Sequence, residues 1–402
     1  MLSYHDAVAR MLQDVQGLPS ERLGLLASSG RIVAATLASP NDAPPFAQSM
    51  VDGYAVRSRD THAATQAHPV RLTLGPTLMA GASLGQPLTP HQALRIMTGA
   101  PLPPGANTVI KLEESTIEDG ALILRQPLPS GLGMQCRGAD IRRQTVILHP
   151  GQRLTPQGIG LALSLGIDTV EVIRQPRVAL IAPGDELLPP GAPWQPGKKW
   201  CSNLYALDLR TQEVGGSSVN LGIVPDTLDS LSTQLQRGLE ADVVVILGAS
   251  GRGDHDFAAR AMAAIGAATV FRGVAANPGR SVTVARCGST LIVGLPGSPW
   301  AAFVGFEVFV WPILRALLHQ KPAVPHPHAA TLMQPLRFRP GMTSFVPTCV
   351  QSTATGMQAW PVTTLLAVAR TPSARLGLLV APPHRRQLPA GAKVRIQPIT
   401  AW

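Results

Sequence analysis

The sequence predicts a multidomain α/β plus β protein, in which a parallel-sheet α/β domain is joined to β-rich domains. Three observations predict it. The 402 residues exceed one ordinary domain, and length alone suggests about three. Short apolar runs alternate with helical patterns between residues 176 and 318, as in a parallel α/β sheet. Short β-rich runs separated by glycine and proline fill residues 31–172 and 331–402.

The composition narrows the classes of partner. Apolar residues make up 45% of the chain, enough for real cores, and the 14% of charged residues argues against disorder across its bulk. The net charge of +10 favours an anionic partner such as a phosphate or an oxyanion, although an arginine-rich composition alone would also account for it. Aromatic residues are only 4%, and nucleic-acid-binding motifs are absent, so we expect no nucleic-acid partner.

The sequence favours a cytoplasmic protein that does not enter a membrane. Its four cysteines lie far apart without a C-x-x-C pair, so we expect a reducing compartment and no disulfide framework. The N-terminus lacks the basic region and apolar core of a signal peptide. The longest apolar stretch, residues 300–314, contains Glu307 and is too short to span a bilayer, so it predicts a buried helix.

The first predicted elements are a helix and a series of short strands. Ser3 can cap the helix, with Asp6 near its positive end. The apolar stripe of this helix consists of Val8, Met11, Leu12 and Val15. Strands are expected at residues 70–74, 108–112, 121–124 and 145–148.

The α/β region and the C-terminal β domain follow. Strands are expected at residues 178–181, 243–247 and 291–293, and helices beginning near residues 202, 228, 257 and 300. Residues 322–328 form a linker, in which His326 and His328 are better explained as polar linker residues than as metal ligands. A last β run covers residues 393–396.

Three of the predicted strands end in loops whose residues could bind a ligand. The loops are residues 184–186, 248–256 and 294–299. Ligands of open parallel sheets bind beyond the carboxyl ends of the strands, so we expect these loops at one edge of one sheet. Their glycines let backbone N–H groups approach an anion, and the helix that follows favours negative charge.

The same loops carry acids that could hold a cation. Asp185, Glu186, Asp254 and Asp256 cannot attract an anion directly, and hard oxygen ligands beside a phosphate suggest Mg²⁺. We expect Glu186, Asp254 and Asp256 to be the magnesium ligands. Asp254 or Asp256 alone would be explained as well by capping of the next helix, but four acids at strand ends favour a site.

Six short segments, in this order, resemble the molybdopterin molybdenumtransferase family (MoeA and the E domain of gephyrin). They are P-P-F-A-Q-S-M-V-D-G-Y-A at 44–55, R-I-M-T-G-A-P-L-P-P-G-A-N at 95–107, G-A-D-I at 138–141, G-D-E-L at 184–187, G-A-S-G-R-G-D-H-D at 248–256 and G-L-P-G-S-P at 294–299. The resemblance covers nearly the whole chain. Each motif is short, but the ordered set is specific.

The resemblance implies a domain organisation and an elongated homodimer. We expect an α/β molybdopterin-binding-like domain at residues 1–21 and 173–320, and a linking β-rich domain at 22–45 and 141–172. A second β-rich domain would cover 46–140, and a C-terminal β-barrel-like domain 329–402. In the family the site lies between the α/β domain of one subunit and the β-rich domain of the other.

The resemblance also implies an activity and its residues. Members of this family insert molybdenum from molybdate into adenylylated molybdopterin and release AMP with a divalent cation, and an apo-molybdoenzyme is a further partner. The family's functional acids match Asp52, Asp140, Glu186, Asp226 and Asp256. The residues that match its binding positions are Thr98, Arg137, Ser202, Asn203, Gly248, Ser250, Gly251, Gly253, Asn277, Gly279, Arg280, Pro296, Gly297 and Ser298.

The chain departs from the family mainly in the part that would hold an oxyanion. The family's K-P-G-K-P has become N-P-G-R-S at 277–281, and asparagine supplies a donor without a charge. The loop G-G-V-S-V-G-D/E has become G-A-S-G-R-G-D at 248–254, and Asn107 replaces an aspartate. Arg252, Arg272 and Arg280 are candidates to compensate, with Arg280 the best candidate for an anion contact.

These departures leave other functions open. A non-catalytic paralogue could bind molybdopterin or a partner enzyme on the same scaffold. Related α/β domains transfer an adenylyl group to molybdopterin. We expect a divergent molybdenum insertase, and these two functions are the alternatives.

Overall fold

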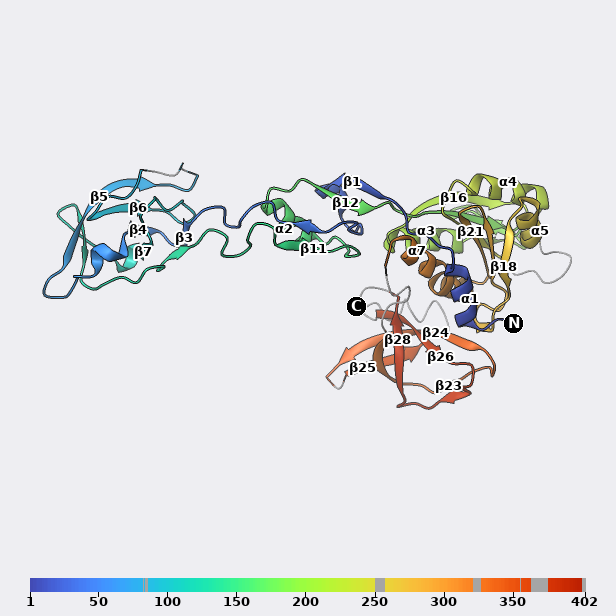
Figure 1. Cartoon of the computed structure of the whole chain (residues 1–402). Coiled ribbons are helices and arrows are strands. Elements are labelled where there is room, and N and C mark those ends of the chain that lie inside the picture. The colour runs from blue at the N-terminus through green and yellow to red at the C-terminus, as the bar shows by residue number, and fades with distance from the viewer. Residues whose placement is uncertain are drawn as a thin grey trace. The chain divides into compact units, whose positions relative to one another are not determined.

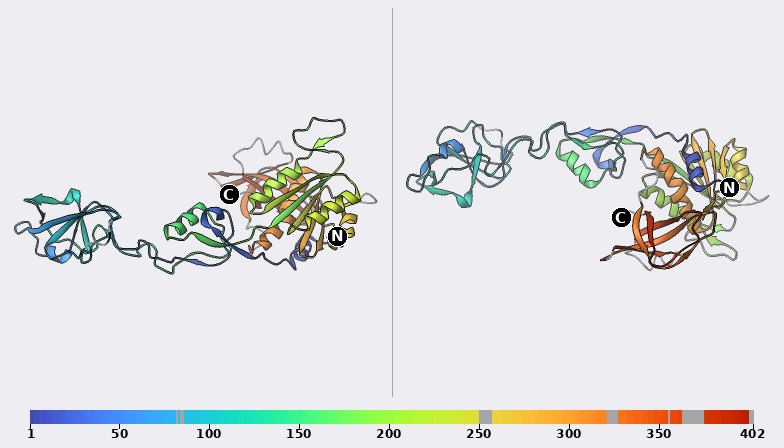
Figure 2. Two further views of the ribbon diagram at one scale, coloured as in Figure 1. Left: turned by 90° about the horizontal axis from the view of Figure 1, so that it is seen from above. Right: turned by 60° about the horizontal axis from the view of Figure 1, so that its bottom comes forward.

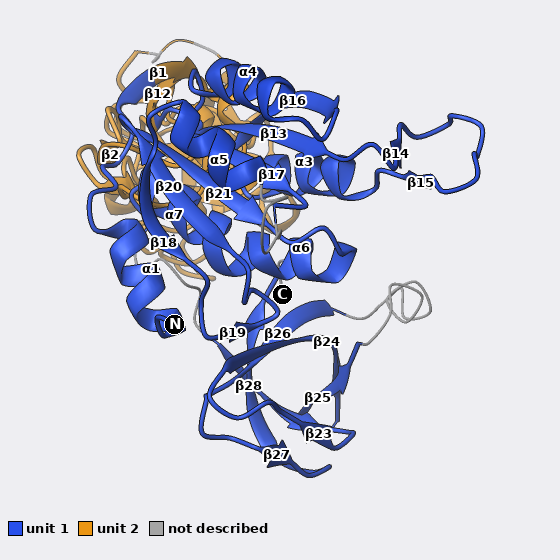
Figure 3. Cartoon of the chain, turned by 90° about the vertical axis from the view of Figure 1, so that its right-hand side faces the viewer, with its two compact units in different colours: residues 1–21, 173–402 blue, residues 22–172 orange. Residues whose placement is uncertain are grey.

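The computed structural model describes residues 1–81, 83, 86–249, 257–320, 327–354, 356–362 and 375–399. The chain forms two compact units, which Figure 3 colours separately. Unit 1 contains Met1–Glu21 and Ile173–Trp402, and unit 2 contains Arg22–Val172. The N–H of Arg174 donates to the carbonyl of Pro19 (2.9 Å), so the chain leaves and re-enters unit 1 at neighbouring points. The predicted fold class, α/β plus β, is confirmed.

The centre of unit 1 is a six-stranded sheet, of which Figure 1 labels β16, β21 and β18. The strand order is β16-β13-β17-β21-β20-β18, and all six strands are labelled in Figure 3. These strands are β13 (Arg177–Pro183), β16 (Ser217–Val224), β17 (Val243–Leu247), β18 (Ala268–Arg272), β20 (Thr283–Cys287) and β21 (Thr290–Leu295). β16, β13, β17 and β21 pair in parallel, but β20 pairs antiparallel with both β21 and β18, so the expected parallel sheet is a mixed one. β17 is buried throughout, as its uninterrupted apolar sequence indicates.

Helices pack on this sheet. They are α1 (Tyr4–Leu12), α3 (Asn203–Glu213), α4 (Leu228–Gly238), α5 (Phe257–Ala264), α6 (Pro299–Gly305) and α7 (Trp311–Leu317), with the π-helical segment η4 (Phe306–Val310) between the last two. Leu231 and Leu235 of α4 and Met262 of α5 form one core with Val244 and Ile246 of the sheet. Ser3 caps α1 as predicted, accepting from the N–H of Asp6 (3.1 Å). The helix ends at Leu12, three residues before the predicted stripe does.

The stretch Pro299–Leu317 is the one helix, among the described residues, that is long and apolar enough to cross a bilayer. Its 19 residues exceed the predicted length, and 67% of the window is buried, as in a core helix. Pro312 has no N–H to donate to the carbonyl of Val308. The hydroxyl of Tyr4, a residue whose pKa is raised by burial, donates to that carbonyl instead (3.3 Å).

A buried ion pair joins α3 to η4. The side chains of Arg210 and Glu307 are 5% and 0% exposed, and Nε of Arg210 lies 2.7 Å from Oε1 of Glu307. Arg210 also pairs with Glu213 (2.9 Å) and donates to the carbonyl of Ile399. Its guanidinium also makes a cation–π contact, 5.5 Å from the ring centroid of Trp311.

The C-terminal part of unit 1 is a closed β-barrel (Figure 2, orange to red). Its strands are β22 (His328–Leu332), β24 (Thr343–Thr353), β25 (Gly356–Pro361), β26 (Arg375–Ala381) and β28 (Lys393–Pro398), with β19 (Ala276–Asn277) added beside β24. The pairing of β24 with β26 closes it, as the predicted barrel-like domain requires. Two short strands, β23 (Leu336–Arg337) and β27 (Gln387–Leu388), pair next to it. A further short pair joins β14 (Leu187–Leu188) to β15 (Lys199–Trp200).

Unit 2 contains a second six-stranded sheet and a smaller cluster. The sheet has the order β7-β4-β6-β5-β9-β8. Its strands are β4 (Gly53–Val56), β5 (Val70–Leu78), β6 (Gln92–Ile96), β7 (Thr108–Lys111), β8 (Thr116–Glu118) and β9 (Ala121–Leu124). The remaining elements are β1 (Ser20–Gly24), η1 (Leu25–Ser28), β2 (Leu37–Ala38), β3 (Gln48–Ser49), η2 (Ser58–Thr61), η3 (Leu112–Glu114), β10 (Met134–Gln135), β11 (Val146–Leu148), α2 (Pro156–Ser164) and β12 (Thr169–Ile173). The four domain boundaries given above stay a prediction.

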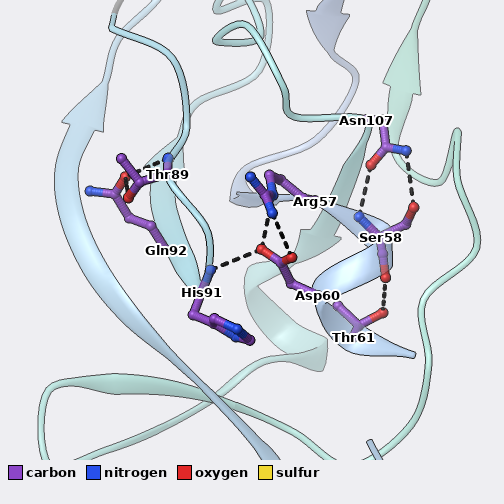
Figure 4. A network of polar contacts seen from close by, with 8 residues as sticks. All are labelled: Arg57, Ser58, Asp60, Thr61, Thr89, His91, Gln92 and Asn107. Carbon is purple, nitrogen blue, oxygen red and sulfur yellow. Dashed lines mark hydrogen bonds and ion pairs between the residues drawn. The ribbon is translucent and has the colours of Figure 1, made fainter. Parts of the chain in front are cut away.

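A polar network fixes one end of this sheet (Figure 4). Asp60 accepts from Nε of Arg57 (3.0 Å), from its terminal nitrogen (2.9 Å) and from the N–H of His91 (2.9 Å). Burial raises the pKa of Asp60, but these hydrogen bonds outweigh it and hold the pKa below its ordinary value. The amide of Asn107 accepts from the N–H of Ser58 (2.8 Å) and donates to the hydroxyls of Ser58 and Ser130 (both 2.9 Å). An aspartate at 107 has no N–H groups to donate.

Replacement of Glu307 by alanine should lower the free energy of unfolding of unit 1 by about 3 kcal/mol, because it leaves the buried guanidinium of Arg210 without its main partner. All six tryptophans lie in residues 194–402, so tryptophan fluorescence during urea unfolding reports on this unit. Glu240→Ala, at an exposed position, should stay within about 0.5 kcal/mol of the parent. A loss below about 1 kcal/mol for Glu307→Ala would show that the pair contributes little.

Replacement of Asp60 by asparagine should lower the opening free energy of β4 and β6 by about 3 kcal/mol, because the Arg57 and Asp60 side chains are only 11% and 7% exposed. Amide hydrogen exchange of these strands measures it. Since the folded pKa is depressed, the pair's contribution is complete above the unfolded value of about 3.9 and is lost as the pH falls through the folded pKa. Asp119→Asn, at a carboxylate 91% exposed, is the control and should change little.

Candidate functional site

A pocket of about 470 Å³ lies at the carboxyl ends of β13, β17 and β21. These strands are neighbours in the sheet, and residues at or after the end of each contribute to the pocket. It is lined by Ala182, Pro183, Glu186, Leu187, Lys199, Trp200, Cys201, Ser202, Asn203, Leu247, Gly248, Gly297, Ser298 and Pro299. Six of the predicted site residues, Glu186, Ser202, Asn203, Gly248, Gly297 and Ser298, are therefore brought together.

Two glycine loops meet closely in this pocket. The N–H of Gly248 donates to the carbonyl of Leu295 (2.9 Å), which ties the loop after β17 to the end of β21. A Cβ added at Gly297 would lie 3.3 Å from Cα of Gly248, so a larger residue would push the loops apart. The two backbones can approach this closely because neither carries a side chain.

The start of α3 forms another wall. The side-chain amide of Asn203 donates to the carbonyl of Gly297 (2.8 Å), which holds this helix start against the loop after β21. Ser202 occupies the N-cap position, but its side chain makes no capping hydrogen bond. The positive end of an eleven-residue helix thus faces the pocket together with a hydroxyl that does not cap it.

The charged groups of the pocket are one carboxylate and one ammonium. Nζ of Lys199 lies 3.1 Å from Oε1 of Glu186, and both side chains are partly exposed, at 66% and 46%. The ladder between β14 and β15 brings them together, with the N–H of Lys199 donating to the carbonyl of Glu186 (2.9 Å). Burial, followed by the charge of Glu186, raises the pKa of the Cys201 thiol, which favours the neutral form.

Sequence reasoning missed Lys199, Trp200 and Cys201 as pocket residues. The signal that could have found them is the pair Lys198-Lys199, because two adjacent lysines between two tryptophans are unusual in a chain with few charges. Lys198 has a different task, since its ammonium donates to the carbonyl of Asp185 and holds that loop.

Asp185 and Asp226 do not line the pocket. The N–H of Asp226 donates to Oδ1 of Asp185 (3.3 Å), which joins the segment before α4 to the loop after β13. Thr227 rather than Asp226 caps α4, accepting from the N–H of Ser230 (3.3 Å). Asp226 is held next to the loop that carries Glu186, and its predicted role stays a prediction.

The segment in which the family's lysines were expected also lies outside this lining. Asn277 pairs with Ser344 of β24, and both Asn277 and Arg280 are exposed. Gly279 is buried against Phe309, whose Cε2 would lie 3.3 Å from an added Cβ. Asn277, Gly279, Arg280 and Pro296 therefore stay predicted binding residues.

Part of the predicted cation site lies outside the described residues. Ser250, Gly251, Gly253, Asp254 and Asp256 lie outside the described residues. Within the described part of the chain, no group of three or more histidines, cysteines, aspartates or glutamates could hold a metal ion. Glu186 is the one predicted magnesium ligand that the structure places, and it faces the pocket.

In unit 2 the structure brings Asp52 and Thr98 together. Oδ1 of Asp52 accepts from the N–H (2.7 Å) and the hydroxyl (2.8 Å) of Thr98, and these bonds lower the pKa of Asp52. Gly53 is required beside it, because an added Cβ would lie 1.9 Å from the carbonyl oxygen of Ile110. Asp52 is therefore held as a carboxylate, in a fixed orientation, at the start of β4.

Asp140 and Arg137 belong to separate contacts in the same unit. Nε2 of Gln135 donates to Oδ1 of Asp140 (2.8 Å) and Nε2 of Gln48 donates to Oε1 of Gln135 (3.0 Å), across the β3–β10 pair. Nε of Arg137 donates to Asp42 (2.6 Å), whose pKa is lowered by the N–H of Arg143 and by Arg137. Arg137 is thus already paired with a carboxylate.

Known protein families match parts of both units. Residues 2–166 match the MoeA N-terminal region (domain I and II), and residues 179–316 match a probable molybdopterin binding domain. A MoeA protein from Pyrococcus horikoshii has a similar structure, with a TM-score of 0.87, 29% identity and 100% of both chains covered.

Two relatives of this chain are molybdopterin molybdenumtransferases. The chain is 34% identical over 323 residues to the molybdopterin molybdenumtransferase of Bacillus subtilis, covering 79% of this chain and 75% of that protein. It is 35% identical over 301 residues to molybdopterin molybdenumtransferase 2 of Mycobacterium tuberculosis, covering 72% and 73%. The chain therefore belongs to the molybdopterin molybdenumtransferase family, transferases of molybdenum cofactor biosynthesis.

Proposed function

We propose that this chain inserts molybdenum from molybdate into adenylylated molybdopterin and releases AMP. The observation that carries the proposal is the pocket at the strand ends, where Glu186, Lys199 and two apposed glycine loops meet at the positive end of α3. Such a pocket supplies backbone donors and a cation for phosphate or oxyanion groups. It also supplies a carboxylate for a divalent ion.

Magnesium would be held by Glu186 together with Asp254 and Asp256. The carboxylate of Glu186 fits because Mg²⁺ prefers one or two protein carboxylates and the oxygens of a bound phosphate. When bound, the ion would neutralise the negative charge of the pterin-nucleotide phosphates. Asp226, tied to the loop of Glu186, would keep this side of the pocket in place.

Lys199 would restore the charge that the chain lacks at Asn277. Its ammonium lines the pocket and forms an ion pair with Glu186. An incoming anion can replace this carboxylate as the partner of the ammonium. Gly248, Ser250, Gly251, Gly253, Gly297 and Ser298 would contact the substrate through backbone and hydroxyl donors. Arg280 remains the proposed second anion contact.

Asp52, Asp140, Thr98 and Arg137 would complete the site from unit 2 of a second subunit. The carboxylate of Asp52 supports this role, because two hydrogen bonds from Thr98 hold it ionised and in a fixed orientation. We propose a cytoplasmic homodimer that passes its product to an apo-molybdoenzyme.

Glu186→Gln should lower turnover about 100-fold, because an amide cannot serve as an anionic ligand of the cation. The assay measures AMP and molybdenum cofactor formed from adenylylated molybdopterin and molybdate. Glu240→Gln removes the same charge from an exposed site and should keep full activity. Asp256→Ala supplies the background.

Two outcomes of this assay would contradict the insertase. No turnover above the Asp256→Ala background, combined with tight pterin binding, would identify a non-catalytic binder. Consumption of ATP with adenylylation of molybdopterin would identify the transferase of the alternative reaction.

Mixing inactive Asp52→Ala and Glu186→Gln subunits should restore roughly one quarter of the parent activity, because half of the dimers are mixed and one of their two shared sites is intact. Subunits are exchanged by mild denaturation and refolding before the same assay. Mixing Asp52→Ala with Asp140→Ala, two changes in the same unit, is the control and should restore nothing. Equal recovery in both mixtures, or none in either, would contradict a shared site.

A further inference from the structure

The positive charge of the chain is concentrated at its C-terminal end. After Glu307 the sequence contains no aspartate or glutamate, whereas residues 308–402 contain ten lysines and arginines. The first 307 residues contain the other 24 basic residues and all 24 acids, so their formal charge is zero. The whole net charge of +10 therefore arises in the last 95 residues.

Four of these arginines gather on two paired segments beside the barrel. β23 and β27 pair antiparallel, with Arg337 opposite Gln387. Backbone hydrogen bonds from Phe338 to Arg386 (2.8 Å) and from Gly341 to Pro383 (2.9 Å) continue the pairing in the same register. The arginine ridge is defined as the exposed residues Arg337, Arg339, His384, Arg385 and Arg386.

Arg337, Arg339 and Arg385 lie on the face of this strand pair that points away from the barrel core, and Arg386, which is exposed, lies opposite Phe338. Leu336, Phe338 and Leu388 pack against that core, so the alternation of a strand directs Arg337 and Arg339 to the other side. The continued register places Arg339 opposite Arg385, where like charges destabilise a strand pair.

Little in the chain neutralises the positive charge of the ridge. Among the described residues, none of its four arginines takes part in an ion pair. The barrel sequence itself has no acid that could supply one. A partner that brings negative charge would relieve this repulsion.

We propose that the arginine ridge is a docking surface for an acidic segment of a partner protein. Guanidinium groups bind carboxylates in two-point contacts, and four of them along a short strand pair match successive acidic side chains. The aromatic ring beside the ridge, Phe338, packs inward. The exposed large apolar residues of the described barrel, Met333 and Val380, are not aromatic. Nucleic-acid bases therefore find no stacking surface there, which favours a protein.

The proposal goes beyond the insertase reaction and does not depend on it. A fluorescein-labelled glutamate-rich peptide is titrated with the full chain, and its anisotropy is followed. Binding should weaken as ionic strength rises. Arg337→Glu with Arg339→Glu should weaken it at least about tenfold. Arg10→Glu with Arg237→Glu reverses the same charge on α1 and α4, and should change it by no more than about twofold.

A second ridge variant controls for misfolding of the first. Arg385→Gln with Arg386→Gln removes repulsion within the ridge and should also weaken binding while tryptophan fluorescence stays that of the parent. Equal weakening in the ridge and helix variants would overturn the proposal, because net charge alone would then explain binding. Tighter binding of a single-stranded oligonucleotide or of phosphatidylserine vesicles than of the peptide would overturn it as well.

Discussion

The buried ion pair between Arg210 and Glu307 is the interaction on which the organisation of unit 1 depends. Removing two charges from water is costly, and only close pairing with further hydrogen bonds offsets it. Arg210 lies two turns into α3, whose first residue is Asn203, and Glu307 follows the helix that begins at Pro299. Asn203 and Pro299 both line the pocket. An electrostatic constraint in the interior therefore positions two walls of the site.

In the α/β region the sequence predicted the strands that form a continuous apolar run and missed strands that mix polar and apolar residues. β17, buried on both faces, was predicted to the residue. β18 and β20 mix polar and apolar residues and lie at the antiparallel edge of the sheet, so no run marks them. This is why a parallel sheet was expected and a mixed one was found.

Residues of the candidate site were predictable where they lie next to a predicted strand or helix or match a family motif. Glu186 was predicted because it follows a strand, whereas Ser202 was predicted because it matches a binding position of the family. Lys199 was missed because its place depends on the short β14–β15 pair, which turns the segment back over the strand ends and has no periodic signal. The family carries a lysine at the position of Asn277, and Arg252, Arg272 and Arg280 were the candidates to replace its charge. The ammonium that lines the pocket belongs instead to Lys199, in another segment of the chain.

The adjacency of Pro19 and Arg174 has a consequence for synthesis on the ribosome. α1 emerges first but packs against α7 and β18, which appear only after unit 2 has been translated in full. The apolar face of the nascent helix therefore stays uncovered until the inserted unit has been translated. Closure of unit 1 is a late step of high sequence separation, so its rate should limit maturation of the whole chain.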